Sequence, residues 1–236
     1  MILLKIENLF VKYHKDDSHA ALDGVSFSIG EGERVALIGA NGAGKSTLLL
    51  TLVGILTPAS GSVLFDGIKL EKSSITQFRK KIGLVFQNPD DQLFMPGVYE
   101  DIAFGPRNMG VGEQKIEAMI DKTLQSFGIL HLKRRSSHKL SGGEKRIVTL
   151  AGVLVMEPRL ILMDEPSSFL DPRACKRLAA ILKELPQAML LATHDLNLAL
   201  ALCDRAILLK EGKIAADGSS QTILKDIELL DFCGLC

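Results

Sequence analysis

Apolar and polar positions alternate along the first part of the chain, which predicts β-strands. Residues 2–13 and 25–38 follow this alternation, with turn residues at Asp23-Gly24 and Gly30-Glu31-Gly32. Residues 81–87 form a further apolar run that predicts a buried strand. We therefore expect a sheet-forming region at the start of the chain.

The section from about 98 to 158 has a helical pattern instead. Apolar residues recur every three or four positions over 111–127 and again over 144–156. Because this section lies between predicted strands, we expect a helical subdomain at about 98–158 that is inserted into the sheet-forming region.

Three compact apolar runs follow, at 159–164, 188–193 and 205–209, and one helical stretch separates each from the next. This strand–helix–strand order implies a parallel sheet. We predict an α/β fold with one catalytic domain over residues 1–220 and a short helical tail over 221–236.

Composition narrows the classes of protein. The 236 residues are 47% hydrophobic, enough to bury a full core, and the 28 basic and 28 acidic residues balance. This balance argues against a general nucleic-acid binder, which carries a basic excess. No apolar run has the length of a membrane span, the first residues enter strand-like alternation without a signal peptide, and the four cysteines form no clear disulfide framework. These features favour a reduced, cytosolic location.

A phosphate-binding loop stands between a predicted strand and a predicted helix. Its sequence is Gly39-Ala40-Asn41-Gly42-Ala43-Gly44-Lys45-Ser46-Thr47, which matches G-x-x-x-x-G-K-[ST]. Gly42 and Gly44 allow the backbone N–H groups to turn toward phosphate oxygens. Lys45 adds a positive charge and Ser46 a hydroxyl ligand for Mg²⁺, while the following helix presents its positive end. The chain is therefore expected to bind a nucleoside triphosphate.

A second acidic element ends another predicted strand. In Leu160-Ile161-Leu162-Met163-Asp164-Glu165-Pro166, a hydrophobic strand places two acids at its carboxyl end, where open α/β sheets bind ligands. We expect Asp164 to hold Mg²⁺ together with Ser46, and Glu165 to polarise a water for attack on the γ-phosphate. Without the phosphate loop, the same residues would indicate only a polar strand end and a turn.

The segment Leu140-Ser141-Gly142-Gly143-Glu144 has two interpretations. Ser141 and Glu144 form an S-x-x-E capping box at the start of a helix, which is a purely structural role. Two consecutive glycines are unfavourable in a first helical turn, but they fit backbone N–H groups that closely approach a phosphate. Since the phosphate loop occupies one side of its own nucleotide, this second site would serve another nucleotide.

These motifs together resemble ABC-type ATPases over nearly the whole chain. The matching features, in the family's order, are the phosphate loop, Gln87, Leu140–Glu144, Leu160–Glu165, Ser168-Phe169-Leu170-Asp171 and His194. The resemblance implies an ABC-type nucleotide-binding domain with an antiparallel β subdomain and a helical subdomain. It also implies ATP hydrolysis with Mg²⁺ in a head-to-tail dimer, where the phosphate loop of one subunit faces Ser141 and Gly143 of the other.

The resemblance assigns expected roles to individual residues. Gln87 is expected to sense Mg²⁺ and the attacking water, His194 to contact the γ-phosphate, and Asp171 to communicate across the dimer. Tyr13 is expected on the adenine ring, although an ordinary strand aromatic is the rival interpretation. Expected catalytic residues are Glu165, His194 and Gln87. Expected nucleotide-binding residues are Tyr13, Asn41, Gly42, Gly44, Lys45, Ser46, Thr47, Ser141, Gly142 and Gly143, and expected Mg²⁺ ligands are Ser46, Gln87 and Asp164.

Further segments resemble the ATPases of energy-coupling-factor importers. They are Asn88–Phe94, Val98–Pro106 and Leu150–Leu154, with Leu93 and Phe94 as an apolar pair that could form a groove for a short helix of a membrane partner. The resemblance implies a homodimer or a paralogous ATPase dimer at the cytoplasmic face of the cell membrane. Its partners would be a coupling subunit and a substrate-binding subunit, both in the membrane. Cobalt or nickel is the first expectation for the cargo, and a vitamin the alternative.

Other classes fit the sequence less well. A soluble ABC ATPase of translation would carry two such domains, a DNA-repair ATPase a long coiled coil, and an exporter its own membrane spans. The amphipathic stretch 223–232 is expected to pack on its own domain or at the dimer interface. Cys233 and Cys236 form a C-x-x-C pair without the two further ligands that a zinc site requires.

Overall fold

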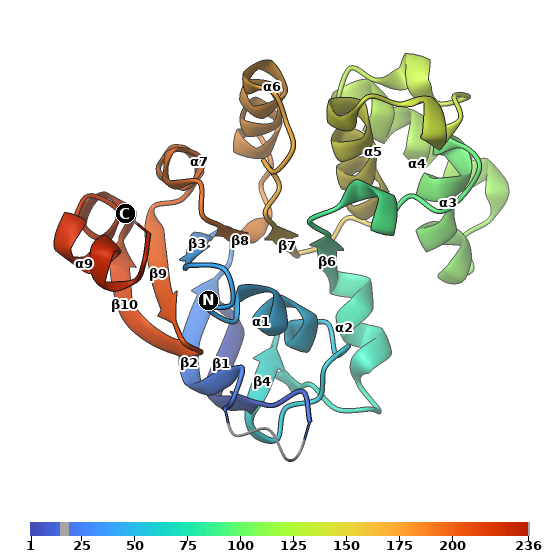
Figure 1. Cartoon of the computed structure of the whole chain (residues 1–236). Helices are drawn as coiled ribbons and strands as arrows, with labels where there is room; N and C mark the ends of the chain where they lie inside the picture. Colours follow the sequence, from blue (N-terminus) through green and yellow to red (C-terminus); the bar gives the residue numbers. More distant parts are fainter. Residues whose placement is uncertain (15–18, 236) are drawn as a thin grey trace. The chain divides into compact units, whose positions relative to one another are not determined.

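The computed structural model describes residues 1–14 and 19–235 of the chain (Figure 1). These residues form two compact units. The first comprises Met1–Leu84, Arg159–Glu165 and the described residues from Pro186 onward, and the second comprises Val85–Pro158 and Pro166–Leu185. The chain therefore leaves the first unit twice and returns to it twice.

A six-stranded sheet forms the centre of the first unit. Its order is β10 (Lys213–Ser219), β9 (Arg205–Lys210), β3 (Arg34–Ile38), β8 (Ala188–Thr193), β7 (Leu160–Asp164) and β6 (Ile82–Val85). The pairs β3–β9, β3–β8 and β7–β8 are parallel, whereas β10 is antiparallel to β9. The parallel sheet predicted from three apolar runs is thus confirmed.

The register of this sheet brings three strand ends to one edge. Ile38 pairs with Thr193, and Asp164 pairs with Ala192, so β3, β7 and β8 end side by side. Open α/β sheets bind ligands at such carboxyl ends, and each of these strands is followed directly by candidate site residues.

An antiparallel sheet completes the β structure of the first unit. Its order is β2 (Leu22–Gly30), β1 (Ile2–Val11), β4 (Ser60–Phe65) and β5 (Ile68–Lys69). The predicted stretch 25–38 belongs to two strands, β2 and β3, which are separated at the turn predicted for Gly30-Glu31-Gly32, where Gly32 has φ +65°. At the β4–β5 hairpin, Asp66 and Gly67 have φ values of 54° and 75°, as a two-residue hairpin turn requires.

The helices of the first unit are short. They are α1 (Lys45–Leu52), α2 (Ile75–Lys81), α7 (Leu196–Leu202), α8 (Ser220–Ile223) and α9 (Ile227–Phe232). The stretch 223–232, expected as one amphipathic segment, is not one helix: Ile223 ends α8, and Ile227–Phe232 form α9. The division has a local cause, since the Asp226 side chain accepts a hydrogen bond from the Leu229 N–H at 3.0 Å and so caps a new helix.

The tail contains the C-x-x-C pair, Cys233 and Cys236. Cys233 is buried and free, and burial raises the pKa of its thiol. Cys236 lies outside the described residues, so the C-x-x-C pair is described at one end only. Within residues 1–14 and 19–235, no helix combines the length and apolar character needed to cross a membrane.

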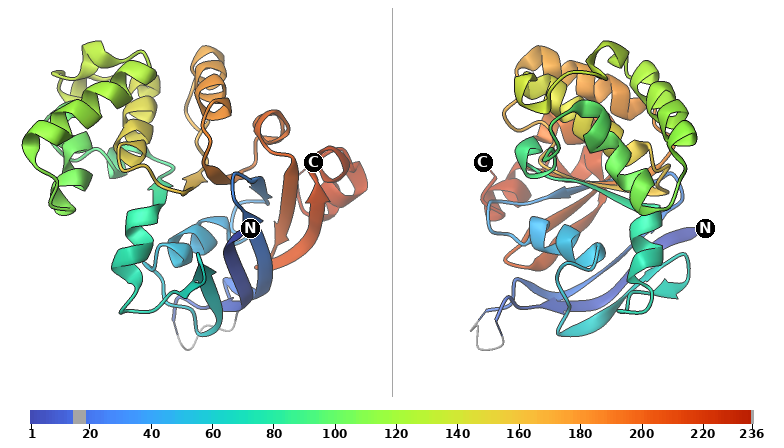
Figure 2. Two further views of the ribbon diagram at one scale, coloured as in Figure 1. Left: turned by 180° about the vertical axis from the view of Figure 1, so that it is seen from behind. Right: turned by 90° about the vertical axis from the view of Figure 1, so that its right-hand side faces the viewer.

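The second unit is helical (Figure 2). It contains α3 (Val98–Asn108), α4 (Glu113–Ser126), α5 (Gly142–Leu154) and α6 (Pro172–Lys183), with 3-10 turns at Pro89–Asp91, Leu130–Leu132 and Ser137–Lys139. Both α3 and α4 pack against α5. The helices predicted over 111–127 and 144–156 are confirmed as α4 and α5, and α6 lies outside the predicted range of 98–158. The predicted α/β class with an antiparallel sheet and a helical part is confirmed, whereas the boundary at residue 220 stays a prediction.

Burial of α1 against the sheet can be tested with Leu48. This side chain is fully buried in the core of the first unit, among residues such as Leu37, Leu190 and Ile207. We expect Leu48→Ala to lower the free energy of unfolding by about 2–5 kcal/mol, because it leaves a cavity in a packed core. Urea denaturation measures the loss. Ile55→Ala is the control, since Ile55 is half exposed, and an equal loss in both variants would contradict the assigned burial.

Candidate nucleotide site

The loop between β3 and α1 leaves the start of α1 open. Gly44 precedes the helix with φ +106°, and no side chain caps the first N–H groups. A Cβ atom at Gly44 would lie 2.6 Å from the Ala21 carbonyl oxygen, and one at Gly39 would lie 2.5 Å from the Leu209 carbonyl oxygen. The backbone of this loop therefore has no room for side chains at these positions, and the uncapped N–H groups are suited to an anion.

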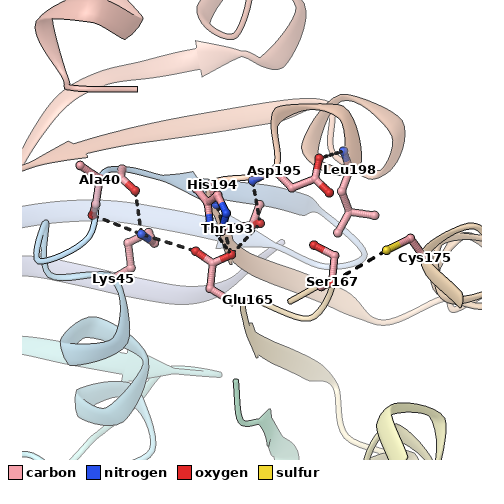
Figure 3. Close-up of polar contacts among 10 residues, drawn as sticks. Ala40, Lys45, Glu165, Ser167, Cys175, Thr193, His194, Asp195 and Leu198 are labelled. Atoms are coloured by element: carbon pink, nitrogen blue, oxygen red, sulfur yellow. Dashed lines mark hydrogen bonds and ion pairs between the residues drawn. The ribbon is translucent and has the colours of Figure 1, made fainter. Parts of the chain in front are cut away.

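Lys45 is held inside the loop that it follows (Figure 3). Its Nζ donates hydrogen bonds to the carbonyl oxygens of Gly39 at 2.6 Å and Ala40 at 3.3 Å, and it lies 3.6 Å from Glu165 Oε1. The residue is only 6% exposed. A buried ammonium is costly without hydrogen-bond or ion-pair partners. The two carbonyl oxygens and Glu165 supply these partners to Lys45.

The two carboxylate oxygens of Glu165 have different partners. Its Oε2 accepts hydrogen bonds from Thr193 Oγ1 at 3.0 Å and from the His194 backbone N–H at 3.3 Å, and His194 Nδ1 lies 2.9 Å from it. Oε1 faces Lys45, and in the described part of the chain it receives no hydrogen bond. Glu165 has φ +43° and is 5% exposed, whereas the His194 side chain is 62% exposed. The carboxylate is thus fixed, while the imidazole can reach a ligand.

Thr193 is a part of this cluster that the sequence did not indicate. The residue is fully buried at the end of β8, and its Oγ1 accepts a hydrogen bond from the Asp195 N–H at 3.0 Å while donating to Glu165. Asp195 in turn caps α7 through the Leu198 N–H at 3.0 Å. The sequence contained one signal for this role, because Thr193 is a polar residue at the end of an otherwise apolar strand and directly precedes His194.

The remaining predicted residues of the first unit lie on the same loop or beside it. Asn41, Gly42 and Ser46 are exposed, and Asp164 ends β7. Thr47 is buried, and the Tyr13 hydroxyl shares a hydrogen bond of 2.8 Å with its Oγ1. Tyr13 is therefore hydrogen-bonded to Thr47 beside the phosphate loop while the residue remains more than half exposed.

In the second unit, the capping box predicted at Ser141 and Glu144 is confirmed. Ser141 Oγ accepts from the Glu144 N–H at 3.3 Å, and Glu144 Oε2 accepts from the Ser141 N–H at 2.8 Å. The hydrogen bond from the Ser141 backbone lowers the pKa of the Glu144 carboxyl, so the box is ionised at neutral pH.

The two glycines of this segment have different roles. A Cβ at Gly143 would lie 3.1 Å from the Ala174 Cβ, so close packing of α5 on the start of α6 favours glycine there. A Cβ at Gly142 would be at an ordinary 3.9 Å from the Phe169 carbonyl oxygen. Local packing thus accounts for Gly143 and leaves Gly142 without a structural reason.

Gln87 lies in a loop that is tied to α5. Its side chain is exposed, and the buried Arg146 of α5 donates to the carbonyl oxygens of Gln87 and, at 2.6 Å, Phe86. Gln92 adds a hydrogen bond from its Nε2 to the Thr149 carbonyl oxygen at 3.2 Å. Arg146 was missed in the sequence, because a charged residue at a helix start does not reveal that it will be buried.

Asp171 caps α6 through the Ala174 N–H at 2.8 Å. Together with Ser141 and Gly142 it lines a hollow of about 600 Å³ in the second unit. Lys45, Glu165 and His194 thus form one cluster in the first unit. In the second unit, one hollow is shared by Asp171 and residues 141–144.

The apolar pair expected at Leu93 and Phe94 is only half correct. Leu93 is buried, at 7% exposure, and contributes to packing rather than to a surface. Phe94 is 59% exposed, and its ring meets that of Phe104 edge to face, with centroids 4.9 Å apart. Asp101 fixes this position by accepting the Phe94 and Met95 N–H groups at 3.0 and 2.8 Å.

Comparison with known proteins places these features in one family. The ABC transporter family model matches residues 22–168. A Streptomyces coelicolor protein, described as an ABC transporter ATP-binding protein without a stated cargo, is 50% identical over 214 residues, 91% of this chain and 82% of the relative. The energy-coupling factor transporter ATP-binding protein EcfA of Methanothermobacter thermautotrophicus is 42% identical over 230 residues, 95% of this chain and 74% of the relative.

Solved structures agree with the sequence comparison. CbiO1 from Clostridium perfringens, part of the ABC transporter complex CbiONQ, matches with a TM-score of 0.86 and 39% identity, over 99% of this chain and 95% of CbiO1. The ATP-binding cassette MJ0796, in a dimeric post-hydrolysis state bound to ADP and Pi, matches with a TM-score of 0.82 and 27% identity, over 92% of this chain and 99% of MJ0796. This chain belongs to the ABC transporter family, as an ATP-binding subunit that hydrolyses ATP.

Proposed function

We propose that this chain powers an energy-coupling-factor importer, with cobalt or nickel ions as its cargo. The relatives EcfA and CbiO1 support the importer class, and CbiO1 as part of CbiONQ favours the metal-ion branch. A vitamin importer of the same type is the alternative for the cargo. A soluble, non-transport ABC ATPase is favoured less, because the exposed Phe94–Phe104 pair has no role in it.

ATP binding exchanges the partners of Lys45. In the present structure its Nζ donates to the Gly39 and Ala40 carbonyl oxygens. Phosphate oxygens are stronger acceptors because they are charged, so the ammonium turns to them while the N–H groups at the start of α1 bind the same anion. Tyr13, attached to Thr47, places its exposed ring where the adenine stacks, and Asn41 and Gly42 line the open side of the loop.

Hydrolysis depends on Glu165, and the observation that carries the proposal is that its buried Oε1 accepts no hydrogen bond in the described part of the chain. Oε1 accepts a proton from a water molecule as the water oxygen attacks the γ-phosphorus, and the bond from that phosphorus to the bridging oxygen breaks, which releases ADP. Thr193 and the His194 N–H hold the other oxygen in place. The exposed imidazole of His194 then contacts the γ-phosphate.

The donor set also fits Mg²⁺. This cation prefers hard oxygen ligands, and the exposed Ser46 hydroxyl and the Asp164 carboxylate supply them at the ends of neighbouring elements of the first unit. The role of Gln87 as a further Mg²⁺ ligand stays a prediction. When bound, Mg²⁺ would neutralise charge on the phosphates, while the chain's own residues orient the nucleotide.

We assign Ser141, Gly142 and Gly143 to the ATP of a second, head-to-tail subunit. Gly142, which local packing leaves unexplained, permits close approach of a phosphate to the first N–H groups of α5. We also assign Asp171, which lines the same hollow, to contact with the partner. The similarity to dimeric MJ0796 supports this assembly, and a paralogous ATPase could take the place of the second copy.

The Phe94–Phe104 pair is the proposed docking surface for the membrane coupling subunit, with the chain held at the cytoplasmic face of the membrane. Exposed aromatic rings on a fixed backbone suit a short partner helix. The Asp101 hydrogen bonds supply that fixed backbone, and Arg146 ties the neighbouring Gln87 loop to α5. Movement of this surface is thereby linked to the Gln87 loop and to α5.

Replacement of Glu165 tests the catalytic assignment. Glu165→Gln keeps the shape and removes the base, so ATP turnover should fall by about 10²–10⁴-fold while ATP affinity is retained. Phosphate release measures turnover, and calorimetry measures affinity. Glu157→Gln is the control, because Glu157 is an exposed carboxylate outside the site. Undiminished turnover in Glu165→Gln would remove this residue from its role.

Replacement of the aromatic pair tests the docking surface. The double variant Phe94→Ala and Phe104→Ala should keep the ATPase rate of the isolated chain within about twofold and lose co-purification with the co-expressed membrane coupling subunit, since aromatic anchors dominate such contacts. Phe232→Ala is the matched control, because Phe232 is an equally exposed ring on α9. Normal co-purification of the double variant would contradict the assignment.

A further inference from the structure

Glu144 places a negative charge at a helix start that the proposed function assigns to phosphate. It is the third residue of α5, and its Oε2 accepts a hydrogen bond from the Ser141 N–H at 2.8 Å. A carboxylate at this position offsets the positive end of the helix dipole. It also repels any phosphate that approaches the same helix start. The residue that caps α5 therefore opposes the binding of an anion there.

Arg135 lies against this carboxylate. Its Nη1 donates a hydrogen bond to Glu144 Oε1 at 3.3 Å, and its Nη2 donates to the Lys139 carbonyl oxygen at 3.4 Å. The backbone of Arg135 is fixed as well, because its carbonyl oxygen accepts the Val98 N–H at 3.0 Å. After the Ser141 backbone, the Arg135 charge is a further cause of the lowered pKa of the Glu144 carboxyl. A positive charge is thus held beside the start of α5.

The fold has little need of this ion pair. The side chains of Arg135 and Glu144 are 46% and 25% exposed, and ion pairs in contact with water add little to folding stability. Both hydrogen bonds of the capping box join Ser141 to Glu144 and do not involve Arg135. A triphosphate carries several negative charges, so the Glu144 carboxylate acts more strongly on ATP than on the folded chain. Neutralisation of Glu144 therefore matters most when a nucleotide is present.

We infer that Arg135 is a positioning residue for the ATP bound by the partner subunit, because it neutralises Glu144 at the start of α5. The inference rests on the proposed head-to-tail dimer and deepens it. Glu144 holds the first turn of α5 in place, and Arg135 removes the repulsion that this carboxylate would exert on phosphate. The helix start is thereby capped and still suited to an anion.

A double-mutant cycle in the Glu165→Gln background tests this role of Arg135, with the dissociation constant of the MgATP-bound dimer as the readout. Light scattering over a range of protein concentrations measures it. Arg135→Ala should weaken the dimer about tenfold, since the Glu144 charge is then unneutralised. Glu144→Gln should not weaken it, because the amide oxygen still accepts the Ser141 N–H and carries no charge. The variant with both changes should dimerise as tightly as Glu144→Gln alone.

Arg134→Ala is the matched control, because it removes the same charge from the exposed neighbouring residue, and its dimer should stay within about twofold of the parent. Urea denaturation should show similar midpoints for all variants.

Two results would overturn the inference and leave the proposed dimer intact. One is an unchanged dissociation constant in Arg135→Ala. The other is a loss in Arg135→Ala that persists when Glu144→Gln is added, since Arg135 would then act independently of the Glu144 charge. A Glu165→Gln protein that binds MgATP and stays monomeric would overturn the self-dimer and the role of Arg135 together.

Discussion

A positive charge buried at the edge of an apolar sheet determines the arrangement of the first unit. The Lys45 ammonium is almost inaccessible to water, and an unpaired ion in such a place would cost several kcal/mol. Two loop carbonyl oxygens and the Glu165 carboxylate are the partners that offset this cost. The loop must therefore curl around Lys45, and β7 must end where its acid faces that charge. A triphosphate satisfies the same ammonium with more negative charge, which makes the site selective for an anion.

The sheet supplies the positions that this charge requires. Parallel pairing of β3, β8 and β7 places the phosphate loop, His194 and Glu165 at neighbouring strand ends, although they are far apart in the sequence. The buried Thr193 hydroxyl joins two of these strand ends by bonding Glu165 and the Asp195 N–H. In the second unit, Arg146 plays a comparable role, because its guanidinium holds the Gln87 loop on α5.

The sequence predicted the features that follow from local rules. The phosphate loop has a fixed spacing, the strands have apolar runs, and the capping box at Ser141 and Glu144 needs only two residues three positions apart. Features that depend on tertiary packing were missed or mistaken. Leu93 was expected at a surface and is buried, and Arg146 and Thr193 gained roles only through partners distant in sequence. The division of the tail into α8 and α9 depended on a cap at Asp226 that the amphipathic pattern concealed.

When ATP binds, the Lys45 ammonium exchanges the carbonyl oxygens of its loop for phosphate oxygens. Isothermal titration calorimetry of MgATP into the wild-type chain and into Lys45→Ala tests it most directly. We expect one ATP per chain for the wild type and an affinity at least about tenfold weaker for Lys45→Ala, because a charge-assisted contact is lost. Equal affinity in the two proteins would show that the buried charge has no part in holding the nucleotide.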